Sequence, residues 1–290
     1  MAILENDFLK VTIRPQGAEL TSIRSKKTGL EHLWQADPAV WNWHAPNLFP
    51  TVGESLNKEL RVDDQSYPIE RHGFARKSDF ALLPSTATHA VFSLRSSKKT
   101  LTAYPYRFEF QVAYALDGPT LIVTYRVLNE DSKPVYFAVG GHPAFRVPLL
   151  PGEDYNDYYL EFDADATALD RHLISEDGYF TGQTRAVPLD GHKLHLTKDL
   201  FNEDALVFKN LQSRSVSLRS TKNPHVLTVA YPAFPYLGIW AKPAAPFVCI
   251  EPWLGCADTE GKPVPIEEKE LIQFAAPGDT FEATFSIRIS

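Results

Sequence analysis

The chain has 290 residues, of which 44% are hydrophobic and 12% aromatic, so it can bury roughly 75% of its unfolded surface in a core. Its formal charge of −7 and its pI of about 5.7 argue against nucleic-acid and anionic-membrane partners, because both require a basic face. Two average domains would fit this length, but large β-sandwiches and barrels reach it as one unit. We therefore expect a single domain over residues 1–290.

The cysteines and the first residues bear on the compartment. Cys249 and Cys256 are too few for a disulfide framework and lack the companions of a zinc site, so we expect two free thiols and no metal. The segment MAILENDFLK carries acidic and polar residues where a signal peptide would be basic and then apolar. No stretch approaches about 18 uninterrupted apolar residues. We expect a cytoplasmic protein.

The hydrophobic pattern has the period of β-strands almost throughout. Residues 107–116 (RFEFQVAYAL) alternate apolar and polar side chains, Asp117-Gly118 is typical of a turn, and residues 121–128 (LIVTYRVL) resume the alternation, which predicts a hairpin. Further short strands are expected at residues 10–13, 80–83, 90–94, 136–139, 158–162, 215–219, 226–230, 237–240, 247–250 and 281–287.

Many short strands divided by turn residues predict an all-β fold, a large antiparallel β-sandwich or a barrel. The 22 prolines and 15 glycines interrupt helical stretches repeatedly. We expect short helices only at residues 198–204 and 265–271, and exposed loops at 152–157 and 175–182.

Three segments place polar residues among glycine, proline and aromatic neighbours, and such violations of the alternating pattern tend to mark functional sites. The first is RHGFAR at residues 71–76. Gly73 permits a tight turn there, so His72 and the two arginines can point toward one region. Arginine binds hydroxyls, carboxylates and phosphates through its planar fork. The alternative is an exposed turn with a surface salt bridge.

The second segment is GGHPAF at residues 140–145. It places His142 at the end of the strand predicted for residues 136–139, on a backbone that Pro143 stiffens. An imidazole can donate or accept a proton near neutral pH, as a general acid or base must. The alternative is a structural histidine that is hydrogen-bonded beneath a loop.

The third segment is IEPWLG at residues 250–255. Glu251 is expected to end the apolar strand 247–250, immediately before Pro252 and Trp253. Partial desolvation there would raise the pKa of the carboxyl group and strengthen it as a base. The Trp253 indole offers an apolar platform of the kind on which sugar rings stack, and Trp240 and Phe74 are further candidates. The alternative for Glu251 is a structural carboxylate.

These residues supply one histidine acid and one carboxylate base. The sequence lacks a glycine-rich phosphate loop, HExxH and GxSxG, which are the usual signatures of nucleotide, zinc-protease and serine-hydrolase chemistry. Glycoside hydrolysis normally uses two carboxylates that flank the scissile bond. We therefore favour proton-transfer chemistry without a cofactor, and keep a non-catalytic carbohydrate-binding or sensing protein as the alternative.

HGFAR at residues 72–76, GGHPAF at 140–145 and PFVCIEPW at 246–253 occur in an order and spacing that resemble the aldose 1-epimerase family, in its LacX-like branch. The resemblance implies a galactose-mutarotase-like β-supersandwich with an open cleft on a concave sheet. It also implies that a free or phosphorylated aldose is anomerised without a cofactor. The implied partner is thus a small-molecule sugar, and the chain would be a monomer or a homodimer.

By the same resemblance, Glu251 is the catalytic base and His142 the acid. His72 would help to bind the sugar near the ring oxygen, and Arg76 would bind its hydroxyls or other polar substituents. Arg71 and Trp253 are further candidates for substrate binding. The family also holds sugar hydroxyls with an aspartate, for which Asp204 is the first candidate.

Two points stay open. Asp199 or Asp190 could take the place of Asp204, which could also be a surface charge. Many relatives carry an arginine just after the glycine of the segment FPTVGESL, where this chain has Glu54. The missing cation weakens the case for a hexose 6-phosphate, although Arg71, Arg76 and Lys242 could compensate.

Overall fold

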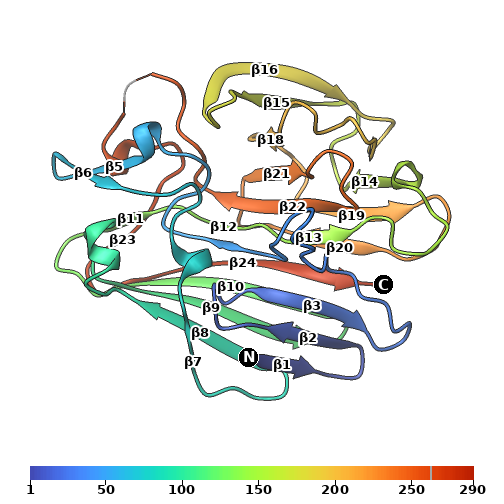
Figure 1. Ribbon diagram of the computed structural model, residues 1–290, viewed down its shortest axis with the longest axis horizontal. Helices are drawn as coiled ribbons and strands as arrows, with labels where there is room; N and C mark the ends of the chain where they lie inside the picture. Colours follow the sequence, from blue (N-terminus) through green and yellow to red (C-terminus); the bar gives the residue numbers. More distant parts are fainter. Residues whose placement is uncertain (262) are drawn as a thin grey trace.

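Two large antiparallel sheets dominate the computed structural model, which describes residues 1–261 and 263–290 (Figure 1). We call the first the back sheet; its nine strands, in spatial order, are β17 (Lys193–His195), β14 (Tyr158–Phe162), β19 (Ser215–Ser220), β20 (Leu227–Ala230), β24 (Thr280–Ile289), β10 (Thr120–Asn129), β9 (Phe108–Asp117), β8 (His89–Arg95) and β7 (Ala81–Leu82).

The second sheet, which we call the site sheet, has eight strands. In spatial order they are β16 (Phe180–Pro188), β15 (Ala168–Ile174), β18 (Leu206–Phe208), β21 (Tyr236–Trp240), β22 (Phe247–Leu254), β12 (Val139–Gly141) and β4 (Asn47–Leu48), with β13 (Ala144–Arg146) also paired to β22.

Smaller elements complete the described chain. The remaining strands form three small sheets: β1 (Ala2–Glu5), β2 (Leu9–Ile13) and β3 (Leu20–Ser25); β5 (Glu59–Val62) and β6 (Gln65–Pro68); β11 (Val135–Phe137) and β23 (Gln273–Ala275). The 3-10 helices are η1 (Leu56–Lys58), η2 (Ala75–Lys77), η3 (Thr100–Thr102), η4 (Tyr155–Asp157) and η5 (Ile266–Glu268). The all-β prediction is confirmed, with 47% strand and 5% helix. Across the described ranges, no helix is long and apolar enough to cross a membrane.

The predicted hairpin is confirmed as β9 and β10. Its register pairs Tyr114 with Val123 and Phe110 with Val127, and all four side chains are buried in the core. Burying a side chain of this size contributes about 1.5–3 kcal/mol. The two large sheets meet over this core, where the Tyr125 hydroxyl of β10 donates a hydrogen bond to Asn47 Oδ1 of β4 (2.8 Å).

Strand β22 corrects the prediction that the strand ends at residue 250. It continues to Leu254 through Pro252, because β21 pairs with it on one side and β12 and β13 pair with it on the other. Pairing on both sides overrides the local turn signal of a proline. Glu251 therefore lies inside a central strand, not at its end.

Other local predictions were wrong in detail. Residues 198–204 form turns instead of a helix, and within 265–271 only the 3-10 helix η5 forms. The expected loop 175–182 is partly strand, because β16 begins at Phe180. The strand expected at 136–139 is divided into β11 and β12, which belong to different sheets. The last two differences follow from strand pairing, of β16 with β15, β11 with β23 and β12 with β22, which local periodicity does not report.

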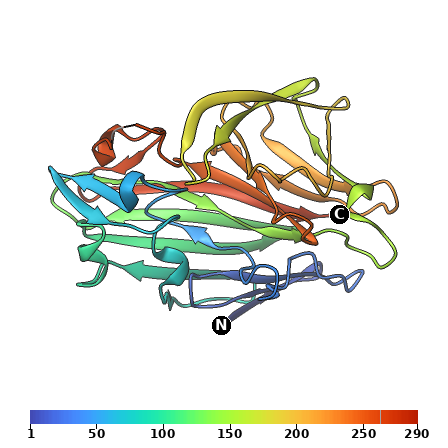
Figure 2. The same cartoon turned by 45° about the horizontal axis from the view of Figure 1, so that its top comes forward.

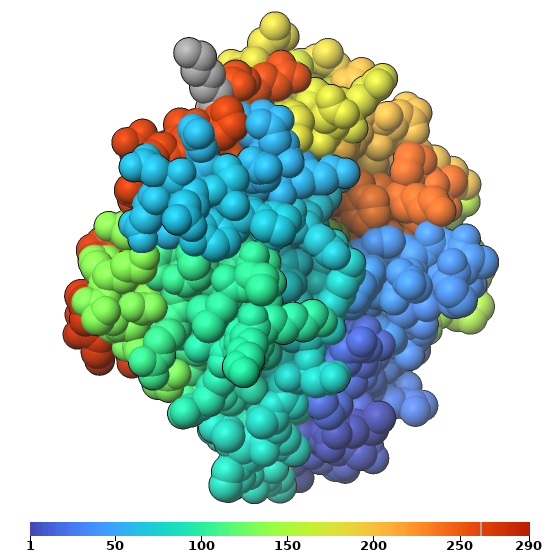
Figure 3. All heavy atoms as spheres, turned by 60° about the vertical axis from the view of Figure 1, so that its left-hand side comes forward, coloured from blue at the N-terminus to red at the C-terminus, as the bar shows by residue number. Residues whose placement is uncertain are grey.

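The hairpin of β15 and β16 stands at the far edge of the site sheet, away from the back sheet (Figure 2). On another face of the molecule, the cyan-blue segment that contains β5 and β6 adjoins the orange-red segment that follows β22, with the yellow hairpin beyond them (Figure 3). Backbone hydrogen bonds confirm part of this arrangement, since the Phe180 N–H donates to Asp258 O (2.9 Å) and the Asp258 N–H to Glu54 O (2.9 Å).

Gly73 provides a test of the turn that carries His72. Its φ of +68° is left-handed, and a Cβ there would lie 2.2 Å from Phe49 O, so Gly73→Ala must both strain and displace the backbone. We expect a loss of about 3–5 kcal/mol in the free energy of unfolding, measured by urea denaturation. Gly118→Ala is the matched control: its φ is +52° with open space around it, and about 1–2 kcal/mol should be lost. Equal losses would contradict the role of the close approach.

Candidate active site

A cavity of about 480 Å³ opens beside the site sheet. It is lined by all seven of the predicted site residues, which come from distant parts of the chain: Arg71, His72, Arg76, His142, Asp204, Glu251 and Trp253. The lining contains cations, anions, imidazoles and an indole, which can together bind a molecule rich in oxygen.

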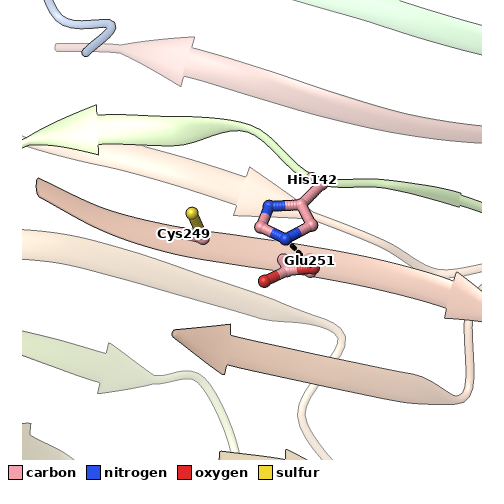
Figure 4. A group of neighbouring side chains, drawn as sticks. All are labelled: His142, Cys249 and Glu251. Atoms are coloured by element: carbon pink, nitrogen blue, oxygen red, sulfur yellow. Dashed lines mark ion pairs between the residues drawn. The ribbon is translucent and has the colours of Figure 1, made fainter. Parts of the chain in front are cut away.

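The strand register places His142 opposite Glu251. Strand β12 pairs Gly140 with Trp253, and β13 pairs Ala144 with Cys249. His142 lies midway between Gly140 and Ala144, and Glu251 lies midway between Cys249 and Trp253 on the opposite strand, so the two residues face each other. The imidazole Nε2 is 3.3 Å from Glu251 Oε2 (Figure 4). Two segments that are about a hundred residues apart in sequence are thus joined by antiparallel pairing.

Burial controls the protonation of this pair. Glu251 is 1% exposed, and its burial raises the pKa of the carboxyl group well above the usual range, while Trp253 and Arg71 act in the opposite direction. Burial also lowers the pKa of His142 to about 3, against a backbone hydrogen bond that raises it. Each group resists charge in a poorly solvated place. The pair is therefore most stable with a single shared proton and no net charge.

Aromatic rings hold the His142 imidazole in place. Trp41 stacks on it at a centroid distance of 5.2 Å, and Trp240 meets it edge-on at 5.8 Å. The His142 backbone N–H donates to Pro46 O (3.1 Å). The imidazole Nδ1 is buried without a hydrogen-bond partner, so Nε2, which faces Glu251, is the nitrogen that exchanges a proton.

His72 presents a second imidazole to the cavity. Its Nδ1 accepts a hydrogen bond from the Gly53 N–H (3.0 Å), so in the neutral ring the proton must lie on Nε2. Burial lowers the pKa of His72 well below the usual range, assisted by His142 and the two arginines nearby. The neutral His72 therefore offers the cavity a hydrogen-bond donor. Its ring lies edge-on to His142 at 5.7 Å.

The two arginines differ in their freedom. Arg76 donates from Nη2 to Arg71 O (2.9 Å), and its guanidinium lies 5.5 Å from the ring centroid of Trp43. Its Nε is buried without a partner. The Arg71 side chain is exposed. It reaches the tip of the β15–β16 hairpin, where a Cβ added to Gly178 would lie 3.3 Å from Arg71 Nη2. Arg76 is thus held in place, whereas Arg71 can adjust.

Asp204 is the one of the three candidate aspartates that lines the cavity. Its Oδ1 accepts a hydrogen bond from the Ala205 N–H (2.7 Å). Asp190 lies outside the cavity, 3.2 Å from His195, and Asp199 also lies outside. Lys242 does not reach the cavity, because its ammonium donates to Val40 O (3.0 Å).

Cys249 shares the same face of β22 with Glu251. The thiol, Glu251 and His142 offer three donor atoms within 4.8 Å of one another (Figure 4). Burial raises the pKa of the Cys249 thiol well above its usual range, whereas a metal requires the thiolate. The chemistry of this group favours proton transfer over metal binding. Both cysteines are free, as predicted.

The family model for aldose 1-epimerase matches residues 2–262. The chain belongs to the aldose 1-epimerase family. The protein LacX, plasmid, of Lactococcus lactis subsp. lactis is 37% identical over 294 residues, 99% of this chain and 98% of that protein.

Two solved structures resemble this family member over its whole length. A galactose mutarotase related enzyme from Lactobacillus acidophilus has a TM-score of 0.94 at 35% identity and covers 100% of this chain and 97% of its own. A galactose mutarotase-like protein from Lactobacillus casei ATCC 334 has a TM-score of 0.94 at 32% identity and covers 100% of both chains. The galactose-mutarotase-like fold is confirmed, and the chain is an isomerase of the mutarotase type.

Sequence reasoning missed part of the cavity lining. Trp41 and Phe180 line the cavity but lie in segments without a strand signal; the aromatic run WNW at residues 41–43 was the available sign. Phe74 was expected as a platform, yet its ring packs on Phe49 at 6.2 Å in the core. Trp240 does line the cavity.

The lowered pKa values predict neutral histidines in the free protein. A lowered pKa means that the ring loses its proton at a lower pH than the usual value of about 6.5. At pH 5.5 we therefore expect ¹⁵N–¹H spectra to show both His142 and His72 as neutral rings, with the His72 proton on Nε2. His142→Asn and His72→Asn variants assign the signals. An imidazolium pattern for either ring at that pH would contradict the burial argument.

Proposed function

We propose that the protein interconverts the α and β anomers of a free hexose by acid–base opening and closing of the sugar ring, with Glu251 and His142 as the exchanging pair. One observation carries the proposal: a buried carboxyl group and a buried imidazole, 3.3 Å apart, line a cavity of about 480 Å³. A paired acid and base is what ring opening needs, and its proton balance requires no cofactor.

The reaction begins with Glu251 as the carboxylate and His142 as the imidazolium. Glu251 takes the proton of the anomeric hydroxyl while His142 donates one to the ring oxygen. The bond between carbon 1 and the ring oxygen breaks, and the aldehyde forms. Rotation about the bond between carbons 1 and 2 presents the other carbonyl face, and reversed proton transfers close the ring as the opposite anomer.

The burial of the pair supports this sequence of steps. After ring opening, Glu251 is protonated and His142 is neutral, which is the arrangement that burial favours through both pKa shifts. The site thereby stabilises the open-chain stage, the high-energy part of the reaction. The ring-closed stage needs the ion pair, which forms when a proton crosses from Glu251 to His142 without a change in net charge.

The other lining residues are proposed to orient the sugar. The Nε2–H of neutral His72 would donate to an oxygen near the ring, and Asp204 would accept hydrogen bonds from hydroxyls. Arg76, which is held in place, and Arg71, which is free to adjust, would bind the more distant hydroxyls. Trp253 would lie under the apolar face of the ring. A non-catalytic sugar-binding protein would use the same groups, but it has no need of the buried acid–base pair.

Removing either member of the pair tests the proposal. We expect Glu251→Gln and His142→Asn each to lower the anomerisation rate by about 10²–10⁴-fold, because each removes one positioned proton-transfer group. Polarimetry on freshly dissolved α-glucose and α-galactose measures the rate, after subtraction of the uncatalysed reaction. Circular dichroism and thermal melting check that both variants remain folded. Full activity in either variant, or sugar binding without acceleration in the wild type, would contradict the proposal.

A phosphorylated hexose is the second candidate, because Arg71 and Arg76 both line the cavity. Glu54 argues against a phosphorylated substrate. Its Oε1 is buried without a hydrogen-bond partner. A Cβ added to Gly178 would lie 3.4 Å from Glu54 Cβ and 3.3 Å from Arg71 Nη2, so both side chains lie near the same hairpin tip. The charge of Glu54 acts on the Arg76 guanidinium, so it offsets part of the positive charge that would attract a phosphate group.

We therefore expect kcat/KM to be higher for glucose or galactose than for the corresponding 6-phosphate, measured by exchange NMR. Glu54→Gln should raise the value for the 6-phosphate by about tenfold, a typical effect of removing one like charge, and leave that for the free sugar within about twofold. A wild type that prefers the 6-phosphate would establish the second candidate instead.

A further inference from the structure

The Trp253 indole lies flat against the site sheet because the strands on both sides of β22 carry glycine. A Cβ on Gly140 of β12 would lie 2.7 Å from Trp253 Cδ1, and a Cβ on Gly238 of β21 would lie 2.7 Å from Cζ2. Any other residue at either position would displace the ring. The two glycines thus fix where the indole can lie.

This placement puts the N–H edge of the ring beside Glu251. Gly238 is the direct partner of Glu251 in the register of β21 and β22. Nε1 is bonded to Cδ1 and to Cε2, and these atoms lie near Gly140 and Gly238 respectively. The Nε1 edge therefore crosses β22 on the face from which Glu251 projects. Both side chains line the same cavity.

Trp253 Nε1 and Glu251 Oε2 are buried, and neither makes a hydrogen bond of acceptable geometry in the described chain, although Glu251 Oε2 also lies 3.3 Å from His142 Nε2. An indole N–H can only donate, and a carboxylate can only accept. Trp253 nevertheless acts on Glu251 as a hydrogen-bonding group that lowers its pKa, against the larger effect of burial. The two groups are close but not yet aligned, as is common in active sites without substrate.

We propose that the Trp253 Nε1–H is a positioning donor for Glu251, forming its hydrogen bond when the carboxylate is ionised with the ring-closed sugar, and that Gly140 and Gly238 hold it there. The inference rests on the proposed role of Glu251 as the base. It gives Trp253 a function beyond that of a stacking platform, because the indole would act on the base and not only on the sugar.

The other charged or titratable groups around Glu251 are independent of this contact. They are His142 at 3.3 Å, Cys249 on the same strand, Arg71 and Asp204. Strand β21 contributes no charged or titratable side chain opposite Glu251, because the residue paired with Glu251 there is Gly238. Replacing the indole by a phenyl ring therefore removes the N–H and leaves these groups in place.

Trp253→Phe is the test. It keeps an aromatic face and removes the donor, so the carboxylate becomes harder to form. We expect kcat to fall about 10- to 100-fold, the usual effect of losing a hydrogen bond to a charged group, with KM changed by less than about threefold. The pair is inactive once it loses its single proton, so the basic limb of the pH profile of kcat reports the pKa of Glu251. This limb should move up by about one pH unit in the variant.

A raised KM with an unmoved basic limb would overturn the inference and leave Trp253 as a platform.

A second measurement does not depend on activity. Infrared difference spectra of protein with ¹³C-labelled glutamate carboxyl groups, wild type minus Glu251→Gln, follow the protonation of Glu251 directly. The midpoint pH of the Glu251 titration should be higher in Trp253→Phe than in the wild type. An unchanged midpoint pH overturns the inference. A wild type that accelerates no sugar would refute the proposed function, while the infrared titration would still decide the role of Trp253.

Discussion

The site depends on one constraint, which is that a carboxyl group and an imidazole are buried together where neither can be charged alone without a large cost. An isolated ion loses several kcal/mol on removal from water. A pair that holds one proton avoids this, because the proton may lie on either member while the net charge stays zero. The 3.3 Å between His142 Nε2 and Glu251 Oε2 is an ion-pair distance without hydrogen-bond alignment, so exchange of the proton requires the two groups to rotate toward each other. This arrangement suits the proposed acid and base, which would exchange roles in each turnover.

The sandwich makes the pair rigid. Strand β22 is paired on both sides, so the backbone at Glu251 cannot shift without breaking two ladders. The partner side is interrupted between β12 and β13, and His142 lies in that interruption, opposite Glu251. The Ile250 N–H donates to Pro143 O across it (3.2 Å).

The sequence allowed some of this to be predicted and not the rest, for physical reasons. Alternation over residues 107–128 predicted the β9–β10 hairpin within a residue or two, because neighbouring segments pair locally. The residue types at His142 and Glu251 pointed to an acid and a base, but their contact depends on a register between strands far apart in the chain. The same dependence explains why β22 continues through Pro252. Trp41 was missed because its place is set by stacking on His142 and not by any period in the sequence.

The division of the cavity between sheet and loops has a consequence for sugar selection. Glu251, His142 and Trp253 belong to or adjoin paired strands, so the proton-transfer groups vary little in position. Arg71 and Asp204 lie in connecting segments and Arg76 in the short 3-10 helix η2, and Arg71 and Glu54 both approach the hairpin tip at Gly178. Turns tolerate substitution far better than doubly paired strands do. A change at Glu54 would therefore alter the charge that the cavity accepts while the acid–base pair stays in place, and one sandwich can serve several aldoses with the same chemistry.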